Sequence, residues 1–69
     1  MFISTRDIML LYKRSLRWSQ VLLQNTRFVL KVRKGEPVTV DQFCKINNLE
    51  NVEEIREFLQ AVDAADLEL

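Results

Sequence analysis

A run of long polar side chains at helical spacing is the feature of this sequence best suited to chemistry. If the segment after Ser15 is a helix, each residue advances about 100° around its axis. One face then gathers cations and amides, namely Arg17, Gln20, Gln24, Arg27 and Lys31. Arginine and glutamine reach the edges of guanine and adenine in the major groove of DNA, while lysine and other arginines hold phosphates. The face therefore predicts contact with a nucleic acid.

We expect two roles for the basic and amide residues of this region. Base edges would be contacted by Arg17, Gln20 and Gln24, and phosphates by Lys13, Arg14, Arg27, Lys31 and Lys34. The alternative is an ordinary solvated helix face. However, no acidic residue occurs between Asp7 and Glu36, whereas exposed helices usually place glutamates four residues from lysines. We therefore favour binding to double-stranded DNA.

The charges divide between the two halves of the chain. The 69 residues include ten basic and ten acidic side chains, so the formal net charge is zero. Residues 1–35 hold eight of the basic residues and only Asp7 among the acids, a net charge of +7, and residues 36–69 carry the opposite −7. Such a chain has a large dipole, and its basic half can attract a polyanion. The acidic half would face away from DNA, or dock on a basic partner or a neighbouring copy.

Several other kinds of chemistry have no residues to support them. The chain has no histidine, a single cysteine and a single glycine. A catalytic nucleophile would lack its usual base, a zinc site its ligands, and a phosphate loop its glycines. We therefore expect no enzyme, no cofactor, no metal and no small-molecule substrate, and we interpret Cys44 as a buried apolar residue. The lone cysteine and the lack of a long apolar run or a signal peptide predict a cytoplasmic protein without a membrane partner.

The elements that must position the basic face are marked by two similar helix starts. Ser4 with Asp7, and Thr39 with Gln42, each form a capping box, in which the hydroxyl accepts from a backbone N–H and the later side chain reaches back. An apolar residue precedes each cap and can pack on the fourth helical position, as Ile3 would on Ile8 and Val38 on Phe43.

These signals predict a small all-α fold of three to four helices. The first helix would run from Thr5 to about Tyr12, and the second from Leu16, capped by Ser15, to about Leu30. A third from Val40 would end near Asn47 and Asn48, because asparagine tolerates the left-handed conformation. Asn51 with Glu54 would open the last helix, which should bury Val52, Ile55, Phe58, Leu59 and Val62. One domain results, with a basic half at 1–35, an acidic helical half at 36–63 and a frayed tail at 64–69.

The second helix has two further stripes. Ser19, Leu22, Leu23, Thr26 and Leu30, with Val29 at the edge, should face the core. A third stripe has heptad-like spacing and comprises Trp18, Val21, Asn25, Phe28 and Val32. We favour its packing beneath the acidic helices. The alternative is a homodimer seam formed by Trp18, Val21, Asn25 and Phe28, with Asn25 setting the register.

The end of the second helix has an alternative conformation. Residues 28–33 are rich in β-branched and aromatic side chains, and Gly35 and Pro37 separate them from a second such run at 38–40. The two runs could pair as a short β-hairpin wing near residues 28–40. We favour a helix to about Leu30 followed by a loop.

Four short motifs carry a family resemblance. They are Ser4-Thr5-Arg6-Asp7-Ile8-Met9, Ser15-Leu16-Arg17, Asn25-Thr26-Arg27 and the run from Pro37 to Cys44. Together they resemble the small helix-turn-helix proteins of bacterial phages and mobile elements and, more distantly, excisionase-type and MerR-type DNA-binding domains. The resemblance implies DNA binding, with Ser15, Arg17 and Gln20 at the front of the recognition helix. Three positions depart from the pattern: Lys13 replaces a glycine, Trp18 a small residue and Thr26 an apolar one.

The sequence thus predicts a helix-turn-helix DNA-binding protein, acting as a small transcriptional regulator or a recombination accessory factor. The alternative is a protein-interaction module that uses the stripe from Trp18 through Val21 to Phe28 and does not bind DNA. A chain of this size has a thin core and no disulfide to support it, which also favours a homodimer.

Overall fold

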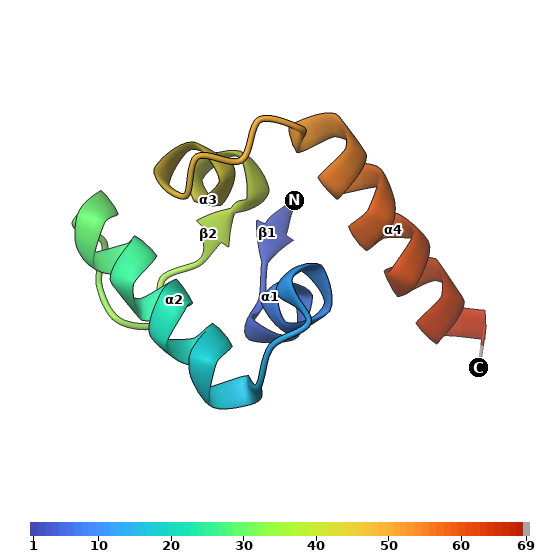
Figure 1. Cartoon of the computed structure of the whole chain (residues 1–69), viewed down its shortest axis with the longest axis horizontal. Helices are drawn as coiled ribbons and strands as arrows, with labels where there is room; N and C mark the ends of the chain where they lie inside the picture. The colour runs from blue at the N-terminus through green and yellow to red at the C-terminus, as the bar shows by residue number, and fades with distance from the viewer. Residues whose placement is uncertain (69) are drawn as a thin grey trace.

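The computed structural model describes the backbone of residues 1–68 and the side chains of residues 1–65. Its elements follow one another as β1 (Phe2–Ile3), α1 (Thr5–Tyr12), α2 (Leu16–Leu30), β2 (Val38–Thr39), α3 (Val40–Ile46) and α4 (Val52–Glu68). The two short strands lie between α1, α2 and α3, and the far end of α4 extends away from them (Figure 1). The small, mostly α fold predicted from the sequence is confirmed.

The helix starts are those that the sequence predicted. The Asp7 amide donates to Ser4 Oγ at 3.2 Å, and the Ser4 amide donates to Asp7 Oδ2 at 2.9 Å. The Thr39–Gln42 box has the same two bonds, at 3.0 and 3.1 Å. At the start of α2, the Trp18 amide donates to Ser15 Oγ at 3.2 Å. These caps act within three residues, so they fix where α1, α2 and α3 begin almost without help from the rest of the fold.

The helix ends depend on residues in the left-handed conformation. Lys13 closes α1 with φ 54°, Lys31 closes α2 with φ 60°, and Asn48 follows α3 with φ 59°. The predicted end of α3 at the two asparagines is therefore confirmed. Lysines hold the other two positions, where a glycine would adopt the same conformation without crowding of a Cβ.

The small sheet joins the two halves of the chain. β1 and β2 pair in antiparallel register, with Phe2 opposite Thr39 and Ile3 opposite Val38. The alternative β-hairpin wing near residues 28–40 is present only in part. Residues 38–39 form a strand, but its partner strand lies at the N-terminus, and Phe28 belongs to α2. Each strand leads directly into a capped helix, and because the strands run antiparallel, α1 and α3 begin at opposite ends of the pair.

The core gathers apolar side chains from every helix and both strands. Its fully buried members are Ile8, Val38, Phe43, Cys44 and Leu59, and Val40, Ile3, Leu23 and Ile55 complete it. Val52 and Val62 of α4 are half-buried, as their stripe predicted. Phe58 was predicted to be buried, and this was wrong, since 44% of it is exposed. It lies on α4 beside Leu10 of α1 and lines a shallow surface hollow instead.

Helix α2 meets the core through small polar residues. Ser19 and Thr26 are buried beside Leu23, and their hydroxyls donate to the carbonyls of Ser15 and Leu22, both at 2.9 Å. Asn47 Nδ2 donates to Thr26 Oγ1 at 3.0 Å and to the Phe43 carbonyl at 3.0 Å. The hydroxyl that departs from the family pattern at Thr26 thus connects α2 to the end of α3.

The predicted frayed tail, residues 64–69, is helical as far as Glu68, because α4 continues through it. Residue 69 lies outside the described part of the chain, as do the side chains of residues 66–68.

Candidate nucleic-acid interface

The turn between α1 and α2 is three residues long and holds the start of α2 against α1. Lys13 has left-handed φ and ψ of 54° and 47°, Arg14 follows, and Ser15 caps α2. The Trp18 ring packs on Tyr12 with centroids 5.1 Å apart, and the Arg14 guanidinium lies 4.6 Å from the Trp18 ring centroid. The departures from the family pattern at Lys13 and Trp18 are therefore compatible with a tight turn.

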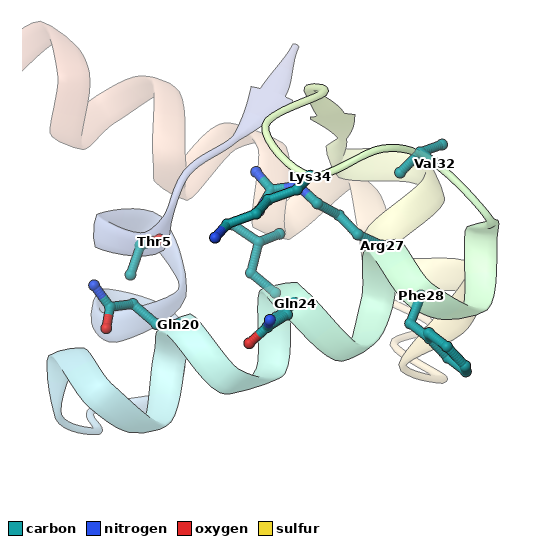
Figure 2. Close-up of a pocket in the computed structure, with 8 residues that line it drawn as sticks. Thr5, Gln20, Gln24, Arg27, Phe28, Val32 and Lys34 are labelled. Atoms are coloured by element: carbon teal, nitrogen blue, oxygen red, sulfur yellow. The ribbon is translucent and has the colours of Figure 1, made fainter.

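A surface groove of about 580 Å³ lies along one side of α2. Figure 2 shows α2 as its floor, with Thr5 of α1 at one end and Lys34 reaching over it from the loop that follows α2. Its lining residues are Thr5, Gln20, Leu23, Gln24, Arg27, Phe28, Val32 and Lys34. The structure thus brings together four of the side chains predicted to contact DNA: Gln20, Gln24, Arg27 and Lys34.

Arg27 is the best-positioned cation of this groove. Its Nε donates to the backbone carbonyl of Glu36 at 3.0 Å, and the residue is half-buried. The bond connects α2 to the 31–37 loop, in which the Glu36 amide donates to the Arg33 carbonyl at 3.1 Å. Gly35 completes that turn with φ 89°. A guanidinium has five N–H donors, so four of those on Arg27 remain for a ligand.

The remaining predicted DNA contacts surround the groove. Lys13, Arg14 and Ser15 lie in the turn before α2, Arg17 in its first turn and Lys31 just beyond its last, and all are exposed. Among the described side chains, neither these cations nor Lys34 forms an ion pair with a carboxylate. Unpaired cations keep their full attraction for an anion, because no neighbouring carboxylate competes for them.

The third stripe of α2 does not pack as we expected. Trp18 contacts the core, but 40% of Val21 and 84% of Phe28 are exposed, and Asn25 is exposed as well. The favoured interpretation, packing beneath the acidic helices, is therefore wrong for these three residues. The acidic helix α4 lies on the other side of the molecule from α2 (Figure 1), so the described part of the chain leaves this side of α2 uncovered.

Four residues from two of the predicted stripes consequently form one outward face. Arg17, Val21, Gln24 and Phe28 follow the spacing i, i+4, i+7 and i+11, which places them within about 60° of one another around the helix. They project opposite the buried side of α2, which is formed by Ser19, Leu23 and Thr26. Two of the predicted base contacts, Arg17 and Gln24, are therefore neighbours of two of the predicted dimer residues, Val21 and Phe28, on a single surface.

The sequence did not identify every residue of the groove. Thr5, Leu23 and Val32 also line it, and none of them was predicted to do so. Thr5 lies fifteen positions before Gln20 in the chain, and only the packing of α1 against α2 brings them together. No local pattern carries that information.

The acidic half differs in its electrostatics. Arg56 of α4 pairs with Asp41 of α3, and its Nη1 lies 3.9 Å from Glu53 Oε1. The buried Cys44 lies in the same region: burial raises the pKa of its thiol, Asp41 raises it further, and Arg56 lowers it. Nowhere in the described part of the chain do three or more His, Cys, Asp or Glu side chains gather to hold a metal ion. None of the described helices is long and apolar enough to cross a membrane.

No protein-family model, curated protein or solved structure matches this chain.

Proposed function

We propose that the protein binds double-stranded DNA, with α2 as the helix that enters the major groove. The major groove is about 12 Å wide and an α-helix with its side chains measures about 10–12 Å, so one helix fits. The proposal is supported by a helix whose exposed side presents arginine and glutamine side chains and no acid. A capped three-residue turn holds that helix against α1, as in helix-turn-helix domains.

The single observation that carries the proposal is the set of unpaired cations around the α2 groove. Lys13 and Arg14 lie before the helix, Arg17 in its first turn, and Lys31 and Lys34 after it. Lysines and arginines at both ends of a helix can hold the phosphates that flank a major groove, while Arg17, Gln20 and Gln24 would face base edges. The N–H groups at the start of α2 would add partial positive charge near the first phosphates.

Arg27 takes a specific role in this arrangement. Because its Nε already donates to the Glu36 carbonyl, its terminal nitrogens are held in place before any ligand arrives. A preorganised cation loses less side-chain entropy on binding. We therefore assign Arg27 to a phosphate contact that also orients the 31–37 loop, which carries Lys34.

The test is the affinity for a mixed-sequence 30-base-pair duplex at several salt concentrations. If about five cations neutralise phosphates, log affinity should fall against log salt with a slope of roughly −4 to −5. The variant Lys31→Ala plus Lys34→Ala, which removes two of the predicted phosphate contacts, should bind more weakly and reduce that slope by about 2. Lys45→Ala is the matched control, because Lys45 is an exposed lysine on α3, away from the groove. No binding at low salt, or equal losses in the control, would refute the proposal.

Within the cell, such a protein would serve as a small transcriptional regulator or a recombination accessory factor. The second candidate is a protein-interaction or homodimer module, which the exposure of Phe28 and Val21 favours. Sedimentation over a concentration series separates the candidates. Self-association abolished by Phe28→Ala, together with a lack of DNA binding, would select the second.

A further inference from the structure

The outward face of α2 alternates polar and apolar side chains. Arg17 and Gln24 can hydrogen-bond, whereas Val21 and Phe28, which share their side of the helix, cannot. Phe28 is 84% exposed, more than any other large apolar residue on the described surface, and its ring projects from the end of α2 away from the body (Figure 2). An exposed phenylalanine ring is less favourable in water than in contact with apolar groups, so this face is suited to a ligand that offers such groups.

The charges around these two residues indicate which ligand that is. Arg17, Gln24 and Lys31 flank Val21 and Phe28, and the described part of α2 contains no carboxylate. Two copies meeting through this face would bring their unpaired cations together, and like charges oppose such contact. A polyanion that also offers apolar groups has the opposite effect. Duplex DNA is such a ligand, because its major groove carries the C5-methyl group of thymine.

We propose that Val21 and Phe28 contact thymine methyl groups, so that the outward face of α2 favours A·T-containing sites. The inference rests on the proposed DNA binding and adds its base preference. Val21 and Phe28 are seven residues apart, about 10.5 Å along the helix, which corresponds to about three base-pair steps. Gln24 lies between them and can bond to the adenine of an intervening pair.

The experiment removes the methyl groups and nothing else. Affinity is measured for a 30-base-pair duplex of alternating dA and dT and for the same duplex with every thymine replaced by deoxyuridine. The mixed-sequence duplex is measured in parallel. Burial of one methyl group corresponds to about a fourfold change in affinity. The unsubstituted protein should therefore bind the thymine duplex about fourfold more tightly than the uracil duplex for each methyl contacted.

Two variants show whether the named side chains cause that preference. Val21→Ala plus Phe28→Ala should bring the affinity ratio of the thymine and uracil duplexes close to one. Val29→Ala is the matched control, since Val29 is an exposed apolar residue of the same helix that lies outside the outward face; it should keep the ratio of the unsubstituted protein. Circular dichroism verifies that each variant is folded. We expect all of them to fold, because the replaced side chains are exposed.

The outcomes separate this inference from the function on which it rests. No binding to the mixed duplex would refute DNA binding itself. If the protein binds the mixed duplex but binds the thymine and uracil duplexes equally well, the methyl contacts alone are overturned. The same holds if it binds the mixed duplex and neither of the other two. A preference that survives in the double variant would also overturn them. Self-association that the double variant abolishes, without any thymine preference, would assign the face to a second copy.

Discussion

Replacing Lys13 with glycine should stabilise the fold and weaken DNA binding at the same time. The conformation of Lys13 is left-handed, with φ 54° and ψ 47°, which costs a residue with a Cβ roughly 1–2 kcal/mol. Glycine relieves that strain but has more conformational freedom to lose on folding, and this loss cancels about 0.4–1 kcal/mol of the gain in stability. The net gain in unfolding free energy should be about 0.5–1 kcal/mol, or about 2–8 °C in Tm for a domain of this size.

Thermal unfolding followed by circular dichroism measures this gain, and Lys13→Ala is the control. Alanine removes the same charge but keeps the Cβ, so it should not raise Tm. Both variants should bind duplex DNA more weakly than the unsubstituted protein, and each should reduce the salt slope by about 1. The exposed Lys13 forms no ion pair among the described side chains, so loss of its charge should not disturb the fold.

Two results would contradict this reasoning separately. A Lys13→Gly protein no more stable than Lys13→Ala would show that the turn is not strained at this residue. Unchanged DNA affinity in both variants would remove Lys13 from the phosphate contacts while leaving the strain argument intact.

Two further predictions concern the connection of α2 to α3 and the buried thiol. Thr26→Val and Asn47→Ala should each destabilise the protein, and a double-mutant cycle in urea should give a coupling energy of about 0.5–1.5 kcal/mol through their shared hydrogen bond; additive losses would show that the bond contributes nothing. Burial raises the pKa of both Cys44 and Tyr12 above their ordinary values of 9.0 and 10.0. Because the folded state holds these protons more tightly than the unfolded state, the unfolding free energy should be intact at neutral pH and fall as the pH rises above about 9. A variant with both Cys44→Ala and Tyr12→Phe should lose less unfolding free energy over this pH range. A pH profile identical to that of the unsubstituted protein would show that these two groups are not the cause.

The starts and ends of the helices could be predicted because their causes are local. Ser4 and Thr39 bond to residues three positions away, and the stop after α3 needs only an asparagine that accepts positive φ. The buried stripe of α2 was predictable for a similar reason, since helical periodicity selects Ser19, Leu23 and Thr26 without reference to their partners.

The features that the sequence left open all depend on contacts between distant segments. The partner of β2 is a two-residue strand at the other end of the chain, and two residues are too few to show an alternating pattern. The exposure of Phe58 follows from which side of α4 meets the body. The bond from Arg27 to the Glu36 carbonyl joins a predicted phosphate contact to a loop whose path no motif specifies.

The exposure of Val21 and Phe28 on the third stripe of α2 bears on whether DNA binding and dimerisation could occur together. As two separate stripes, a dimer seam and a DNA-reading face could operate together, as in helix-turn-helix dimers that read two half-sites. On a single outward face they cannot, because a second copy packed on Val21 and Phe28 would cover Arg17 and Gln24 in the same protomer. Any dimer compatible with DNA binding must therefore use another surface. Exposed Leu10 and Phe58 on α1 and α4 lie away from the α2 groove, so a dimer formed through them would leave the outward face of α2 free.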